Sequence, residues 1–154
     1  MPKRFKVGPI SLPEILVVGI SCQKADYWIA FRINEVLHVD LRRADDLVID
    51  HLSEELKLNY ALFHADIFDS RNSCYLIANH HPDRKLFPAQ RMSDYFFIVG
   101  GRLSEFEKQM LLTGIKKIPS VLTAFFLKPD TMKNFSGIIN DLEIHLAGRK
   151  AKSA

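Results

Sequence analysis

Apolar residues along the chain gather in short runs that predict the strands of a sheet. Three runs are rich in β-branched and aromatic residues: ILVVGISC (15–22), DYFFIVGG (94–101) and SVLTAFFL (120–127). Such runs are typical of buried strands. The last run contains no charged residue, and an exposed apolar strand at a sheet edge promotes aggregation. We therefore expect this strand to be central in a sheet or to be covered by a partner.

Three other segments have apolar residues at helical spacing, and they predict amphipathic helices at 24–39, 103–118 and 129–146. The second helix has the clearest boundaries. Ser104 and Glu107 have the spacing of a capping box, and a proline follows the last turn. These signals are local, so they indicate where the helix begins and ends without reference to the rest of the fold.

The middle of the chain predicts paired strands. Segment 58–68 alternates apolar and polar residues, the polar cluster 69–73 interrupts it, and 74–79 returns as a second strand of a β-hairpin. Segment 42–50 is ambiguous and can extend as an edge strand. Because hairpins join the middle strands, the sequence predicts an α+β fold. We expect a mainly antiparallel sheet of five to six strands with helices packed on one face.

The length of 154 residues fits a single α+β domain over 1–154, with flexible basic tails at about 1–6 and 149–154. Of the 21 basic residues, six lie in these tails, which hold no acidic residue. Residues 7–147 therefore carry 15 basic and 18 acidic residues. A nucleic-acid binder has a basic face on its folded body, so nucleic acid is an unlikely partner.

The two cysteines, Cys22 and Cys74, form no C-x-x-C pair and are expected to be buried free thiols in the cytoplasm. No apolar run reaches the ~20 residues of a membrane span, so we expect no membrane partner. The chain also lacks a dinucleotide fingerprint, a P-loop and a G-x-S-x-G elbow. No cofactor is expected.

A short motif lies before the strand at 94–101. The stretch FPAQRMSDY (87–95) resembles the signature Ile-Pro-Glu-x-x-x-Val-Asp-Tyr of the IPExxxVDY family, which comprises small uncharacterised bacterial proteins. Pro88, Asp94 and Tyr95 match, and the other three named positions differ. The resemblance implies no particular activity. We favour a structural role, in which the proline sets a turn and the aspartate binds backbone N–H groups. A general base with a phenol donor is the alternative.

One set of residues has metal-binding chemistry. Strand alternation places His64 and Asp66 on one face, and pairing Phe68 with Cys74 across the hairpin brings His80 diagonally next to His64. Two histidines and one carboxylate are ligands that zinc or non-haem iron accepts. A slip of one residue in register would move His80 to the other face.

The chain is therefore predicted to be a non-catalytic interaction or regulatory module that forms a homodimer. Its 11 phenylalanines suggest more apolar surface than one small core needs, and no enzyme motif is present. The alternative is a small metal-dependent enzyme or ligand-binding protein that uses His64, Asp66 and His80. In a third interpretation, the basic tails contact nucleic acid or an acidic partner.

Overall fold

A computed structural model describes residues 14–51, 56–82, 84–132, 135, 137–140 and 142. The basic tails expected at 1–6 and 149–154 lie outside these residues. The elements in chain order are β2 (Ile15–Cys22), α1 (Asp26–Leu37), β3 (Arg42–Arg43), β4 (Leu47–His51), β5 (Leu56–Tyr60), β6 (Leu62–Ile67), β7 (Asn72–Ala78), β8 (Tyr95–Gly100), α2 (Glu105–Lys116), β9 (Val121–Leu127) and the 3-10 helix η2 (Pro129–Thr131).

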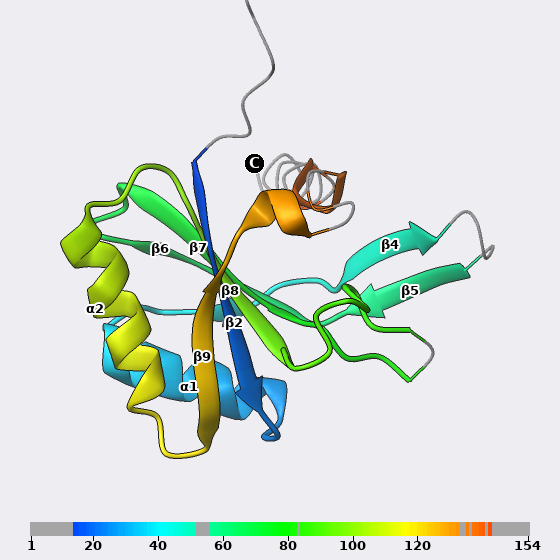
Figure 1. Ribbon diagram of the computed structural model, residues 1–154, viewed down its shortest axis with the longest axis horizontal. Helices are drawn as coiled ribbons and strands as arrows, with labels where there is room; N and C mark the ends of the chain where they lie inside the picture. Colours follow the sequence, from blue (N-terminus) through cyan, green and yellow to red (C-terminus); the bar gives the residue numbers. More distant parts are fainter. Residues whose placement is uncertain are drawn as a thin grey trace, which may run out of the picture.

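Within the described residues, six strands form one antiparallel sheet in the order β3-β6-β7-β8-β2-β9 (Figure 1). β2 lies between β8 and β9, so strands that are far apart in the sequence pair with each other. A separate hairpin, β4–β5, forms a second antiparallel pair. The α+β class predicted from the sequence is confirmed. β3 and β9 are the two outer strands of the main sheet.

Helices α1 and α2 cover one face of the main sheet. Alternate residues of the central strands, such as Val18 and Phe97, point to this face and are fully buried against the helices. The capping box predicted for α2 is present: Ser104 Oγ accepts from the Glu107 N–H at 3.1 Å, and the Glu107 carboxylate accepts from the Ser104 N–H at 2.9 Å.

The opposite face of the sheet is covered as well, which corrects the expectation that all helices lie on one face. Phe96 and Ile98 point to this side and pack with residues of the β4–β5 hairpin and with Phe135 and Ile138. Phe135 and residues 137–140 are helical and belong to the segment predicted as the last helix. In Figure 1, α2 lies on the left of the sheet and β4–β5 on the right. The sheet is therefore the middle layer between two cores.

The middle of the chain differs from the prediction in two places. Segment 42–50 is not one strand, because β3 belongs to the main sheet and β4 to the separate hairpin. The long strand expected at 58–68 is also divided, at Ala61. Tyr60 on β5 and Leu62 on β6 are both fully buried on the second face of the sheet. The chain thus changes from one sheet to the other at Ala61 while it keeps both neighbours in the core.

The turn between β6 and β7 has an uncommon backbone. Phe68, Asp69 and Ser70 have φ values of 58°, 55° and 65°, so three successive residues other than glycine adopt the left-handed region. L-residues avoid this region, at a cost of roughly 1–2 kcal/mol each. The turn spans residues 68–71 and is shorter than the five-residue loop expected at 69–73.

Candidate functional site

Asn79, a residue outside the family-like motif, holds the motif loop in place. Its side chain is fully buried at the end of β7. Asn79 Oδ1 accepts from the Phe87 N–H at 2.7 Å, and Asn79 Nδ2 donates to the carbonyls of Ser93 at 2.8 Å and Gln90 at 3.1 Å. One amide side chain therefore satisfies three backbone groups of the loop that connects β7 to β8. Sequence reasoning missed this residue, although a polar residue directly after a buried strand was an available signal.

The motif residues Pro88 and Asp94 both have structural contacts. Pro88 follows Phe87 in a tight turn that is closed by a 3.0 Å hydrogen bond from the Gln90 N–H to the Phe87 carbonyl. Asp94 Oδ2 accepts from the Cys22 N–H at 2.8 Å, and the Asp94 N–H donates to the Ile20 carbonyl at 2.7 Å. Asp94 thus continues the pairing of β8 with β2 beyond the last strand residues.

Tyr95 is fully buried, and its hydroxyl donates to the Lys24 carbonyl at 2.5 Å. Burial, with smaller contributions from nearby acidic groups such as Asp26, raises the pKa of the Tyr95 phenol well above its ordinary value. The phenol therefore keeps its proton at neutral pH. Together with Asp94, it fixes the connection between β2 and α1 from two points. These contacts support the structural interpretation of the motif over the general-base alternative.

Ser93 occupies the motif position that is valine in the family signature. Its side chain is fully buried, and its Oγ makes no hydrogen bond with the described residues. It faces Gly19 of β2, where a Cβ would lie 2.6 Å from Ser93 Oγ and 3.1 Å from Phe125 Cε2. Gly19 is therefore required by the close approach of the loop and of β9 to β2.

The residues proposed as metal ligands are not brought together. Ala65, and not Phe68, is opposite Cys74, so His64 is opposite Tyr75. The His64 ring stacks on the Tyr75 ring with 5.1 Å between centroids. His80 lies beyond the end of β7, edge-on to Tyr95 at 5.2 Å. Among the residues that the structure describes, no group of three His, Cys, Asp or Glu side chains is arranged to hold a metal ion. The predicted register is wrong because the turn is tighter than expected.

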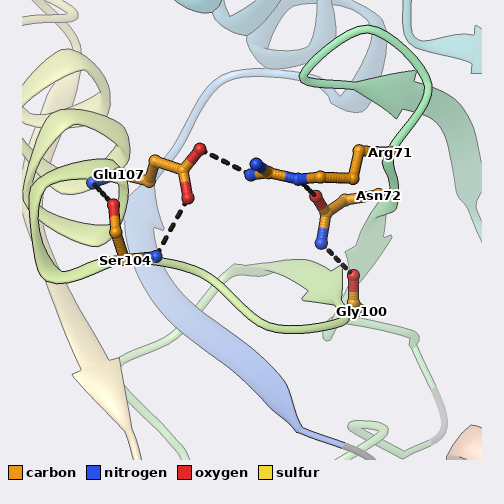
Figure 2. A network of polar contacts seen from close by, with 5 residues as sticks. All are labelled: Arg71, Asn72, Gly100, Ser104 and Glu107. Carbon is orange, nitrogen blue, oxygen red and sulfur yellow. Dashed lines mark hydrogen bonds and ion pairs between the residues drawn. The ribbon is translucent and has the colours of Figure 1, made fainter.

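A polar network joins the β6–β7 turn to the beginning of α2 (Figure 2). Arg71 binds the Glu107 carboxylate at 2.5 Å and donates to Asn72 Oδ1, and Asn72 Nδ2 donates to the Gly100 carbonyl. The hydrogen bond from the Ser104 N–H, followed by the one from Arg71, lowers the pKa of the Glu107 carboxyl. The carboxylate therefore favours the folded state above its unfolded pKa of ~4.3, and this contribution is lost as the pH falls through the folded pKa.

One exposed apolar feature is at β9, an outer strand of the main sheet. Within the described chain, β9 pairs with β2 on one side and with no strand on the other. Leu122 is 73% exposed and Phe126 is 37% exposed. The register between β2 and β9 shifts between Ser21 and Cys22, so Leu122 has no direct partner on β2. We call the outer side of Val121–Leu127, with these two side chains, the β9 edge.

A second exposed apolar site lies on the helices. Phe106 is 76% exposed and Met110 43% exposed, one turn apart on α2. They line a groove of about 590 Å³ whose other walls include Glu35 and Lys117. Charged side chains therefore border this groove, whereas β9 itself contains no charged residue. None of the helices in the described part of the chain has the length and apolar character needed to cross a membrane.

The comparisons with known proteins add no identification. No family model, curated protein or solved structure matches this chain. The resemblance to the IPExxxVDY family thus continues to rest on the sequence, on residues 87–95 and on the family-like segments DYWIAFRIN, YLIANH and DYFFIVGG.

Proposed function

We propose that this chain is a non-catalytic module that binds another protein through the β9 edge. The observation that carries this proposal is the position of β9. A seven-residue strand without a charged side chain forms an outer edge of the main sheet, with Leu122 and Phe126 exposed. Unpaired N–H and C=O groups beside exposed apolar side chains attract a further strand.

β3, the other outer strand of the main sheet, differs from β9 in its length and in its charge. β3 has only two residues, Arg42 and Arg43, and both are exposed. Short length and positive charge are devices by which proteins keep an edge strand from pairing with other chains. The same sheet thus has one protected edge and one unprotected edge. This contrast supports a binding role for β9.

The polar residues give less support to a catalytic role. Asp94 and Tyr95 direct their side-chain hydrogen bonds to backbone groups of the β2–α1 connection. Both cysteines are buried thiols without a disulfide, which supports a cytoplasmic location. The matches at Pro88, Asp94 and Tyr95 support membership of the IPExxxVDY family as part of the same proposal.

Photo-crosslinking tests the proposal in the cells from which the chain comes. A photoreactive phenylalanine analogue replaces Leu122 in one variant and Phe106 in a matched variant, because the two side chains are about equally exposed. We expect protein adducts from position 122 and few from position 106. If position 122 gives no adduct, or if both positions give the same adducts, the β9 edge is not a specific binding surface.

A further inference from the structure

The backbone of β9 has a defined outward side, which follows from the pairing of β2. The Ile20 carbonyl accepts from the Asp94 N–H, so the backbone groups of Ile20 point to β8 and away from β9. Ala124 is opposite Ile20, and Phe126 is two residues further along. Because direction alternates along an antiparallel strand, Ala124 and Phe126 point their N–H and C=O groups away from β2. Among the strands that the structure describes, none pairs with these groups, so they can bind a further strand.

Two copies of β9 can pair antiparallel with apolar residues opposite apolar residues. A twofold axis at Ala124 places Leu122 opposite Phe126 of a second copy, and Val121 opposite Leu127. Each exposed apolar side chain therefore meets the other exposed apolar side chain. Because Ala124 points its backbone groups outward, the central pair of alanines forms two hydrogen bonds in this register.

The residues on each side of β9 fit the same axis. β9 ends three residues from Ala124 on each side, and Pro119 and Pro129, each five residues from Ala124, stand opposite each other beyond both ends, where the fixed φ of proline does not continue an extended strand. Lys128 falls opposite Ser120 of the second copy, so the two lysines lie at opposite ends of the strand pair, roughly 26 Å apart. No like charges face each other along the pair.

We infer that the partner at the β9 edge is a second copy of this chain, paired antiparallel through β9 about a twofold axis at Ala124. The inference rests on the proposed function and specifies its partner. Two main sheets then form one continuous sheet through the dimer. The exposed Leu122 and Phe126 side chains of both copies cover one another, which explains why the monomer exposes apolar side chains at this edge.

Sedimentation velocity of the full chain from about 1 to about 200 µM tests the dimer. We expect a concentration-dependent dimer whose dissociation constant rises at least tenfold in the Leu122→Lys variant. Phe106→Lys is the control, because it adds the same charge at an equally exposed apolar position on α2. It should change the constant less than twofold. A monomer at every concentration overturns the inference, as does a dimer that Phe106→Lys dissociates and Leu122→Lys does not.

A mixed cysteine experiment tests the register. The native cysteines are buried, so an introduced surface cysteine is the accessible thiol. Opposite residues of an antiparallel strand pair have Cα atoms ~4.5–5.5 Å apart, which suits a disulfide. Leu122→Cys mixed with Phe126→Cys should give a disulfide-linked heterodimer on mild oxidation, while each variant alone should remain largely unlinked. Equal linking of Leu122→Cys with itself rejects this register.

The two proposals fail in different ways. If the chain is monomeric but the photoreactive group at Leu122 captures a different protein, the interaction function stands and the dimer is rejected. If position 122 captures nothing and the chain is monomeric, both are rejected. In that case the register shift at Leu122 has a protective role, because such bulges also keep edge strands from pairing.

Discussion

Replacing Asn79 with alanine should destabilise the protein strongly, although the residue is neither charged nor part of the motif. The substitution removes three hydrogen bonds of 2.7, 2.8 and 3.1 Å, together with a long one of 3.5 Å from Asn79 Nδ2 to the Phe87 carbonyl. The loss of two of these hydrogen bonds leaves a buried backbone group without its partner, the Phe87 N–H in one case and the Ser93 carbonyl in the other. A buried polar group without a partner costs roughly 1–3 kcal/mol, so we expect a loss of about 4 kcal/mol in the free energy of unfolding. Small domains have only ~5–15 kcal/mol in total.

Urea denaturation followed by circular dichroism measures this loss. With a slope of ~2 kcal/mol per molar urea, the midpoint should fall by about 2 M. Asn59→Ala is the matched control, because Asn59 is exposed on β5, and its effect should stay within ~0.5 kcal/mol. Equal midpoints for the two variants would refute the reasoning, since they would show that the loop keeps its backbone groups satisfied without the Asn79 amide.

The Asn79→Asp variant separates the hydrogen bonds from the shape of the side chain. Aspartate keeps the acceptor for the Phe87 N–H but turns a charged oxygen toward the carbonyls of Ser93 and Gln90. A buried carboxyl in this position favours its protonated form, so its folded pKa lies above its unfolded value. The variant should therefore lose stability, relative to the unmodified chain, as the pH rises above ~4. A loss that does not change between pH 4 and 7 would contradict this account.

Three further predictions concern the backbone and the surface network. Gly19→Ala should lower the free energy of unfolding by about 2 kcal/mol in thermal melts, because the new Cβ would lie 2.6 Å from Ser93 Oγ. Gly100→Ala is the control and should leave the stability unchanged, because the atom nearest to its new Cβ is 4.0 Å away. Ser70→Gly should raise the free energy of unfolding by about 0.5–1 kcal/mol, because glycine adopts a φ of 65° without strain. An unchanged urea midpoint would show that Ser70 is not strained in this turn. Arg71→Ala should raise the pKa of Glu107 in an NMR titration but leave it below the ordinary value, because the larger contribution, the hydrogen bond from the Ser104 N–H, remains. If the pKa of Glu107 returns fully to its ordinary value, Arg71 and not the cap is the main cause of the lowered pKa.

Features of the fold that depend on neighbouring residues could be predicted from the sequence. The capping box of Ser104 and Glu107 is an example, because both halves lie within one helical turn. The strand at 94–101 agrees with β8 to within one residue at each end, because a continuous apolar run has few alternatives. The turn at Pro88 was also predictable, since proline fixes its own backbone angle.

Features that depend on pairing between distant segments could not be predicted in this way. The hairpin register depends on Phe68, Asp69 and Ser70, whose side chains give no signal for three left-handed residues. As a result, His64 is opposite Tyr75, and the predicted metal set is not assembled. The apolar character of β9 was clear, but its position at an edge depends on β2 pairing with it from the other end of the chain.

The unequal edges of the main sheet also limit how far copies of this chain can associate. A sheet with two open edges can add neighbours at both ends and grow into a fibre. Here the short, arginine-bearing β3 occupies one end of the main sheet, so among the described strands of that sheet β9 is the edge that favours strand addition. Once two copies meet there, the joined sheet has a β3 strand at each outer end. In the proposed dimer, an apolar edge that is otherwise a hazard for polymerisation would be restricted to a closed pair.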